Sequence, residues 1–410
     1  MRVSFFIARR IAFNKASSFS RFIITIATAA TAISVAVMIL ATALVTGFQQ
    51  TIQDKIFSFW GHLHVNLYQP NASPLTEQPP IFNDANFRQK ALALPGVTGI
   101  NTFATKSVLV KAGKDIEGMI FKGVGPDYNW QNIGRFLQEG RLIKYNDSAF
   151  ASEVLVSAGT ATLLNLKLND PIIVYFVRGG GLPPRARKLT IVGIYKTGIE
   201  EYDKTYFLGD LQLIRKLNEW EDNQIGGYEI FLKDYTKMDE TAELLVDFMP
   251  EKQTVRTMKD IYPNIFDWLA LQNKNEVIIL IIMTIVAIIN MVTAILILIL
   301  ERTNMVGILK ALGMHDNSLQ EIFVFQSAYI VLTGVVIGNV IGLGLAFLQQ
   351  QTGFFKLPEE SYYMSVAPIA LQWWKVALIN VGTLVICTVI LYIPSILIRK
   401  IVPVRAIQFK

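Results

Sequence analysis

The stretch ERTNMVGILKALGMHDNSLQEIF, from Glu301 to Phe323, interrupts a long apolar region of the sequence. The residues just before it, Val277–Leu300, carry no charge, and charge-free sequence resumes at Ile322 and continues to Phe355. Four apolar residues inside the stretch repeat at offsets of three, four and seven: Met305, Ile308, Leu309 and Leu312. This spacing predicts a short amphipathic helix between two helices that are long and apolar enough to cross a membrane.

The sequence also predicts where this short helix ends and where the next helix begins. Gly313 follows the apolar stripe at the position where glycine commonly ends a helix, and Ser318 and Glu321 have the spacing of a capping box that would begin the next one. Arg302, Thr303 and Lys310 lie off the stripe. Two interpretations stay open: a helix resting on lipid headgroups, or a coupling helix seated in a groove of a cytoplasmic motor protein.

Long charge-free windows occur at four places: Phe22–Gln53, Val277–Leu300, Ile322–Phe355 and Val376–Ile398. Each contains the roughly 20 apolar residues that a helix needs to cross the hydrocarbon core of a bilayer. The first window is longer than the apolar part of a signal peptide, and no clear cleavage site ends it, so we expect it to remain as an anchor. The chain is therefore expected to cross a membrane four times.

The short flanks of these windows predict the orientation. The first 21 residues include several basic residues and no acidic residue. Arg399, Lys400, Arg405 and Lys410 follow the last window. Positive flanks stay on the cytoplasmic side, so both termini are expected there. The segment between the first two windows and the segment Gln349–Trp374 are then outside. The formal net charge of +6 reflects this topology and does not indicate nucleic-acid binding.

The outer segment of about 200 residues, 62–261, mixes strand-like and helix-like periodicity. Runs such as PIIVYFV and KLTIVGIY predict strands, and runs such as GDLQLIRKLNEW predict helices. The single cysteine, Cys387, allows no intrachain disulfide. The expected fold is an α-helical membrane protein with four transmembrane helices plus a large α+β domain inserted between helices 1 and 2, carried on extensions of both helices.

Residues of the kind that carry catalysis or bind metals are scarce. His62 and His64 lie on one face of a predicted strand, but no third ligand accompanies them, which favours a structural or surface pair over a metal site. The glycine-rich segment RGGGLPPR, Arg178–Arg185, lacks the Gly-Lys-Ser/Thr of a nucleotide-binding loop. Gly334, Gly338 and Gly342 form a small-residue seam that favours close helix packing. We expect no enzyme activity and no cofactor in this chain.

The coupling stretch resembles that of the FtsX-like, MacB-type (type VII) ABC transporter permeases. The residues VGILKALG, Val306 to Gly313, match the family's hydrophobic-Gly-hydrophobic-Leu-Lys-Ala-Leu-Gly core. FIARRIAFNKASSFSRFI resembles the elbow helix of the lipoprotein-releasing LolC/LolE branch, and LVTGFQQTIQDKI, LPEESYY and VPVRAIQFK resemble other segments of that branch. The resemblance implies that the ATPase-coupling residues are Arg302, Met305, Val306, Ile308, Leu309, Lys310, Leu312 and Gly313.

The resemblance also implies a mechanism and partners. A LolD-like ATPase dimer binds ATP and magnesium, and its movement passes through the membrane helices to the periplasmic domain of a permease pair, identical or paralogous. The cargo is an acylated lipoprotein drawn from the bacterial inner membrane and handed to a LolA-like periplasmic carrier. Two alternatives stay open within the superfamily: a MacB-like efflux permease and an FtsX-like regulator of cell-wall hydrolases. A membrane-anchored enzyme is a third.

Two further residue sets are hypotheses. Acyl chains are expected against Leu44, Val45, Phe48, Ile52, Leu269 and Ile279, although the same stripe is typical of helices that pack only on each other. The carrier is expected to bind the loop residues Arg178, Leu182, Pro183, Pro184, Arg185 and Arg187, although this composition is also typical of a mobile hairpin tip. The expected boundaries are 1–20 elbow helix, 21–61 transmembrane helix 1 and stalk, 62–261 periplasmic domain, 262–300 stalk and transmembrane helix 2, 301–317 coupling helix, 318–348 transmembrane helix 3, 349–374 periplasmic loop, 375–398 transmembrane helix 4 and 399–410 cytoplasmic tail.

Overall fold

A computed structural model describes residues 18–70, 78–112, 115–146, 150–178 and 182–400. Most of the expected elbow helix, and the tail from 401 on, lie outside these residues. The chain divides into two compact units. We call Met1–Gln50, Leu269–Lys356 and Val366–Lys410 the helical unit, and Thr51–Trp268 with Leu357–Ser365 the sheet unit.

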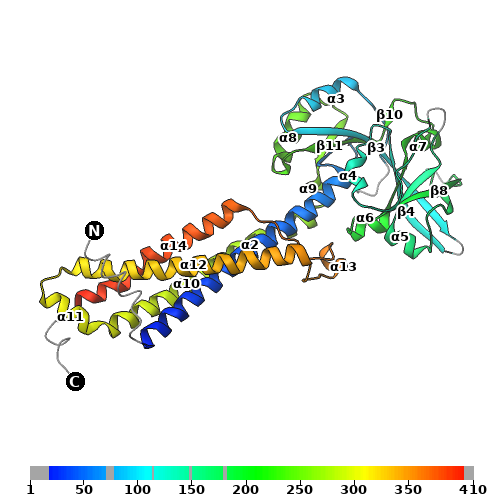
Figure 1. Ribbon diagram of the computed structural model, residues 1–410. Coiled ribbons are helices and arrows are strands. Elements are labelled where there is room, and N and C mark those ends of the chain that lie inside the picture. The colour runs from blue at the N-terminus through cyan, green and yellow to red at the C-terminus, as the bar shows by residue number, and fades with distance from the viewer. Residues whose placement is uncertain (1–17, 71–77, 113–114, 147–149, 179–181, 401–410) are drawn as a thin grey trace. The chain divides into compact units, whose positions relative to one another are not determined.

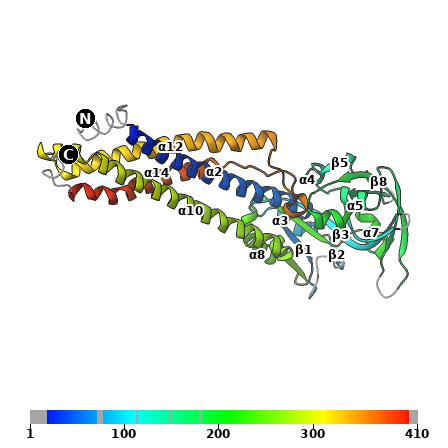
Figure 2. The same ribbon diagram turned by 90° about the horizontal axis from the view of Figure 1, so that it is seen from below.

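Four helices long and apolar enough to cross a membrane occur among the described residues, which confirms the predicted number. They are α2 (Ser18–Trp60), α10 (Pro263–Glu301), α12 (Asp316–Thr352) and α14 (Trp373–Ser395). Figures 1 and 2 show the four running side by side. The short helix α11 (Thr303–Ala311) lies between α10 and α12 in sequence, and the 3-10 turn η2 (Ile396–Lys400) follows α14.

The glycine seam of α12 packs against α2 within the helical unit. A Cβ atom at Gly338 would lie 2.7 Å from the Ala32 carbonyl oxygen, and one at Gly342 would lie 3.1 Å from the Ala36 Cα. The two backbones therefore approach more closely than any larger residue allows. A reciprocal amide pair, Asn339–Asn380, joins α12 to α14 with hydrogen bonds of 2.8 and 2.9 Å.

The predicted capping box at Ser318 and Glu321 is wrong. Helix α12 begins two residues earlier, at Asp316, with His315 as the extended N-cap residue and no side-chain cap. Asp316 occupies the first turn, where a carboxylate interacts favourably with the helix dipole. The Asp316 carboxylate also lies 2.9 Å from the Lys310 ammonium. These two interactions explain why the helix begins ahead of the serine.

In the described part of the sheet unit, ten strands form one mixed sheet in the order β12-β1-β11-β3-β4-β9-β6-β8-β5, with β7 pairing β3 and β8. Among the described strands, only β4–β9 and β6–β8 pair in parallel. The strands are β1 (Leu63–Leu67), β3 (Val97–Ala112), β4 (Asp115–Val124), β5 (Leu137–Gly140), β6 (Glu153–Ser157), β7 (Pro171–Phe176), β8 (Arg185–Tyr195), β9 (Tyr206–Asp210), β11 (Gly227–Leu232) and β12 (Gln253–Thr257). A separate pair is formed by β2 (Ile81–Phe82) and β10 (Gln224–Ile225).

Short helices pack on this sheet, α7 against β3 and β4, α3 against β3 and α8 against β12. The helices are α3 (Ala85–Leu92), α4 (Trp130–Gly134), α5 (Ala158–Leu163), α6 (Glu200–Thr205), α7 (Leu211–Asn218), α8 (Met238–Val246) and α9 (Met258–Ile261), with the 3-10 turn η1 (Tyr235–Lys237). The runs PIIVYFV and KLTIVGIY form β7 and β8, and GDLQLIRKLNEW contains α7, as predicted. The mixed sheet with its helices confirms an α+β domain.

The segment Leu357–Ser365, which follows α12 in the chain, belongs to the sheet unit and contains the short helix α13 (Glu359–Tyr362). Its Glu359 carboxylate lies 2.7 Å from the Lys196 ammonium, just after β8. The Lys55 ammonium, near the end of α2, donates to the Tyr363 carbonyl at 2.5 Å. Gly198, with φ +75°, leaves the space that these groups need.

Candidate functional site

Helix α11 divides the predicted coupling residues into an inner and an outer set. Val306 is fully buried, and Met305 and Leu309 pack against the core of the helical unit. Ile308 and Leu312 face outward and are 47% and 79% exposed. The apolar residues that the sequence places on one stripe therefore lie on two faces, because part of the stripe packs against the protein's own core.

A charged residue of α11, Lys310, also makes contacts within the protein. The Lys310 side chain is only 10% exposed, pairs with Asp316 and donates to the Arg399 carbonyl at 3.2 Å. Gly313 adopts φ +88° just after the C-cap residue Leu312, as its predicted role as a helix-ending glycine requires. Arg302 is half-buried at the start of α11. The outer surface available for a partner therefore consists mainly of Ile308, Ala311, Leu312 and Gly313.

The six residues predicted to contact acyl chains also differ in exposure. Leu44 is 39% exposed, while Val45, Phe48 and Ile279 are half-buried. Ile52 and Leu269 are 1% and 4% exposed, so they pack inside the protein. Among these six residues, only Leu44, Val45, Phe48 and Ile279 offer surface to a lipid chain. The role of the set stays a prediction.

The predicted carrier loop is the tip of the β7–β8 hairpin, whose last pair is Phe176 with Arg185. Residues 179–181 lie outside the described part of the chain. Leu182 is 51% exposed and the two prolines after it are exposed as well. Arg178 and Leu182 also line a hollow of about 470 Å³, together with Pro79, Pro80, Lys106 and Trp220.

One arginine of the hairpin has an acidic partner that the sequence does not reveal. Arg185 Nη2 lies 2.9 Å from the Glu219 carboxylate, and its Nη1 donates to the Leu217 carbonyl at 3.1 Å. Glu219 is 34 positions away and follows α7 with φ +60°. The base of the hairpin is thus tied to the end of α7, whereas the Arg187 Nη1 donates to the neighbouring Ala186 carbonyl.

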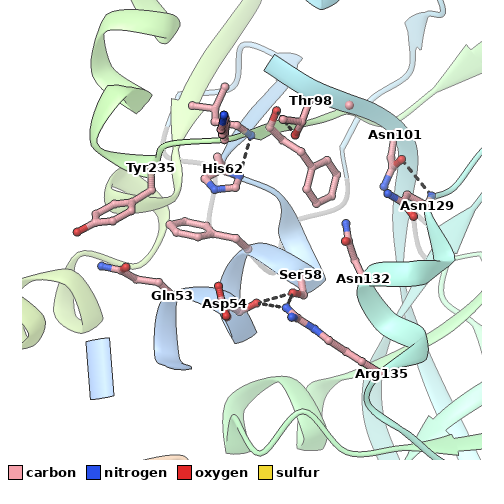
Figure 3. A pocket seen from close by; sticks show the side chains of 15 residues that line it. Gln53, Asp54, Ser58, His62, Thr98, Asn101, Asn129, Asn132, Arg135 and Tyr235 are labelled. Carbon is pink, nitrogen blue, oxygen red and sulfur yellow. Dashed lines mark hydrogen bonds between the residues drawn. The ribbon is translucent and has the colours of Figure 1, made fainter. Parts of the chain in front are cut away.

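A polar cavity of about 340 Å³ lies where the last turns of α2 meet β3, α4 and β11 (Figure 3). Arg135 reaches back to α2, where it donates to the Asp54 carbonyl at 3.0 Å and to the Ser58 hydroxyl. The Asn101 side-chain oxygen accepts a hydrogen bond from the Asn129 backbone N–H at 3.2 Å. These polar groups hold α2 against α4 and β3. The sequence did not reveal the cavity, because its wall comes from distant segments.

The two histidines are buried structural groups, and only His62 lines this cavity. His62 and His64 are 8% and 7% exposed, and burial lowers the pKa of His62 to about 4. Burial, and secondarily the Lys122 charge, lower the pKa of His64 to about 3. Within the described residues, no group of three or more His, Cys, Asp or Glu side chains could hold a metal ion. Both histidines are therefore neutral hydrogen-bonding groups at physiological pH.

Comparison with known families defines the class of protein. The family model for the MacB-like periplasmic core domain matches residues 24–248, more than half of the chain. The model for the FtsX-like permease C-terminal region matches residues 277–403. The chain therefore belongs to the FtsX-like permeases that carry a MacB-like periplasmic core domain.

Individual relatives match over nearly their whole length. The chain is 22% identical to the lipoprotein-releasing system transmembrane protein LolC of Neisseria meningitidis serogroup B, covering 97% of this chain and 96% of that one. It is 22% identical to the LolE protein of the same system in Haemophilus influenzae, covering 92% of each chain. The solved periplasmic region of MacB from Actinobacillus actinomycetemcomitans aligns with 50% of this chain and 91% of its own, at 12% identity and a TM-score of 0.34.

Proposed function

We propose that this chain is the permease subunit of an ABC transporter that extracts lipoproteins from the bacterial inner membrane. The observation that carries this proposal is the match to LolC and LolE proteins over 92–97% of the chain, which includes both units. A match limited to one domain would support membership of the superfamily but not a role in lipoprotein release. The chain itself is not expected to be an enzyme; ATP and magnesium would be bound by a separate, LolD-like ATPase dimer.

In this proposal the exposed face of α11 meets the ATPase. Ile308 and the C-cap residue Leu312 are apolar and exposed, as the anchors of a helix seated in a partner's groove would be. Both termini would be cytoplasmic, the sheet unit periplasmic, and a second permease subunit, identical or paralogous, would complete the complex. Movement would pass along α2 and α10, which continue without interruption into the segments next to β1 and β12.

The cargo and the carrier occupy two further surfaces in the proposal. Acyl chains of the lipoprotein would lie against Leu44, Val45, Phe48 and Ile279, since burial of each methylene contributes about 0.8 kcal/mol. The β7–β8 hairpin would hold a LolA-like periplasmic carrier through Leu182, Pro183 and Pro184. Two exposed prolines give this tip a restricted conformation, which lowers the entropic cost of binding.

A second candidate is a MacB-like efflux permease, which is favoured by the family match over residues 24–248. An FtsX-like regulator of cell-wall hydrolases is the third, favoured by the match over residues 277–403. Purification of the complex from its native membrane separates the three. Acylated lipoprotein and an ATPase bound to the permease support lipoprotein release. An outer-membrane channel partner would support efflux, and a periplasmic hydrolase would support the regulator.

The decisive test is release from a defined membrane. The permease complex is reconstituted with an acylated lipoprotein in proteoliposomes or nanodiscs, and a soluble LolA-like carrier is added. We expect ATP, but not a non-hydrolysable analogue, to transfer lipoprotein to the carrier. Absence of ATP-dependent transfer by a complex that hydrolyses ATP would reject this function.

A further inference from the structure

Helix α2 passes into the sheet unit almost without a connecting loop. It ends at Trp60, and strand β1 begins at Leu63. Gly61 adopts φ +72° and donates its N–H to the Phe57 carbonyl at 2.8 Å, and the His62 N–H donates to the Ile230 carbonyl at 2.8 Å. A glycine in this conformation is the usual way to end a helix, but it is also a point where the backbone can bend.

The carbonyl groups that remain at the end of α2 receive donors from the sheet. A helix terminus leaves its last carbonyls without partners inside the helix and carries a partial negative charge. The Lys122 ammonium of β4 donates to the Phe59 carbonyl. The His64 Nε2 of β1 is 2.9 Å from the Trp60 carbonyl oxygen, and neutral His64 donates there. A buried cation is thus placed at the negative end of a helix of 43 residues.

Lys122 is also half of a buried ion pair. Its Nζ lies 2.6 Å from Glu229 Oε1 on β11, and both side chains are completely buried. The same ammonium lies 4.0 Å from the centroid of the Trp60 ring and 4.6 Å from that of Phe59. Burial lowers the pKa of Lys122 and raises the pKa of Glu229, and each charge partly opposes the shift of the other.

Stability alone does not explain this pair. Two apolar side chains of similar volume usually stabilise a buried site at least as well as an ion pair, because the charges must give up their hydration. Unlike an apolar side chain, the ammonium is attracted to two separate negative groups, since it lies 2.6 Å from the Glu229 carboxylate and donates a hydrogen bond to the Phe59 carbonyl. The pair therefore restrains the angle at which α2 meets β4 and β11.

Both long helices connect to neighbouring strands at one end of the strand order, and Glu229 lies on β11, the next strand after these two. Strand β1 pairs with β11 on one side and with β12 on the other, and Leu63 is opposite Thr257. The chain leaves β12 through α9, which a capping box of Thr257 and Asp260 fixes, and enters α10 at Pro263. A movement of α2 thus enters the sheet one strand away from the point where α10 leaves it.

We propose that Lys122 and Glu229 form a positioning joint that locks the end of α2 to the sheet, so that movement of this helix is transmitted to the sheet instead of being lost by bending at Gly61. The role in transmission rests on the proposed function; the restraint of the joint does not. Both side chains are completely buried, so in this proposal they act through the direction of α2.

The test removes the charges and keeps the volume. Lys122→Met with Glu229→Leu is the joint variant, and Arg141→Met with Glu153→Leu is its matched control. The control removes an ion pair of 2.5 Å in the same sheet unit, whose side chains are 43% and 24% exposed. In the reconstituted complex, we expect the joint variant to hydrolyse ATP within twofold of the wild-type rate but to release at least fivefold less lipoprotein per ATP. The control should match wild type.

A second measurement does not depend on the transported cargo. Hydrogen exchange of the full-length permease in nanodiscs follows the backbone amides of residues 61–65. Their exchange should be at least tenfold faster in the joint variant and unchanged in the control. If the joint variant does not fold, the isosteric Glu229→Gln takes its place in both measurements, with the same direction expected.

The outcomes separate the two ideas. A wild-type complex that releases no lipoprotein rejects the proposed function, while hydrogen exchange still tests the joint. Unchanged exchange at residues 61–65 in a folded variant overturns the joint. Faster exchange with unchanged release per ATP overturns the part of the proposal that concerns transmission.

Discussion

Ile308 and Leu312 are the two large apolar side chains of the α11 region that the protein leaves uncovered. We predict that Ile308→Asp with Leu312→Asp preserves thermal stability but weakens ATPase binding at least tenfold, because interface anchors commonly contribute more than about 1 kcal/mol each. Titration of the purified ATPase onto the permease in nanodiscs measures this. The control is Ile116→Asp on β4, which is 59% exposed and lies in the sheet unit.

The neighbouring positions should behave differently. The sequence alone suggests Leu309→Asp with Lys310→Glu as the test of coupling, since both positions precede the next membrane helix. In the structure Leu309 packs against the helical core and Lys310 pairs with Asp316, so this variant buries one carboxylate and places another beside Asp316. It should lose about 2–4 kcal/mol of stability. Equal effects of the two double variants on stability and binding would contradict the division of α11 into two faces.

The histidines at the start of β1 predict a pH dependence. Their folded pKa values, about 4 for His62 and about 3 for His64, lie below the ordinary value of 6.5. The unfolded chain therefore binds more protons between these values, and stability falls as the pH decreases from about 6.5 towards 4. Each histidine contributes of order 3 kcal/mol over this range.

Thermal unfolding of the full-length protein at pH 7.5 and pH 5.0 tests this dependence. His64→Gln keeps an amide donor for the Trp60 carbonyl but does not titrate, so it should reduce the difference in Tm between the two pH values. A difference as large as in the wild type would show that His64 does not carry the effect. The carboxylates titrate equally in both proteins, so they cancel in the comparison.

At the scale of elements, the α2–α12 contact depends on a missing side chain. Gly338→Val places a Cβ 2.7 Å from the Ala32 carbonyl and 2.8 Å from the Val35 Cβ. Since a backbone carbonyl cannot move aside easily, we expect a loss of about 1–3 kcal/mol. Gly344→Val on the same helix is the matched control, because nothing lies within 4 Å of its Cβ position. Thermal unfolding in detergent should separate the two variants; identical curves would refute the close contact.

The β7–β8 hairpin is the second element that a variant can isolate. Deleting residues 179–184 leaves the paired strands from Phe176 and Arg185 onward, so the sheet unit should keep its circular dichroism spectrum while carrier capture is lost. Arg187→Glu should weaken capture without disturbing the contacts of Arg185. Arg185→Glu also breaks the pair with Glu219, which is partly exposed and stabilises the fold by only about 0–1 kcal/mol. Full carrier capture by the folded deletion variant would end the carrier-loop hypothesis.

At the scale of the whole molecule, the proposed function requires a lipid-accessible path for the cargo. A photo-reactive residue at Leu44 or Phe48 should crosslink acylated lipoprotein in the nucleotide-free complex, because these positions have exposed surface. The same residue at Ile52, which is 1% exposed, should crosslink only to protein. Mass spectrometry of the adducts distinguishes lipoprotein from phospholipid. Adducts to phospholipid alone at Leu44 and Phe48 would argue against a cargo path along this face.

The sequence by itself determined the features that depend on local pattern. The four apolar helices, the strands at PIIVYFV and KLTIVGIY, and the glycine that ends α11 at Gly313 were all predicted, because hydrophobic length, alternation and φ > 0 preferences act over a few neighbouring residues. The short helix α11 was predicted for the same reason, from the spacing of its apolar residues. Its position between two apolar helices is a property of the chain order.

Only the tertiary structure decided which side chains of these elements are available. The inward turn of Leu309, the pairing of Arg185 with Glu219, and the burial of Lys122 beside Glu229 join residues that are distant in sequence or that share one helical stripe. One sequence does not predict such pairs, because neither residue has a local pattern that identifies its partner. The pair becomes evident only when the fold brings the two side chains within a few ångströms. Tertiary packing therefore determines which face of α11 is exposed, and it places a buried cation at the end of α2.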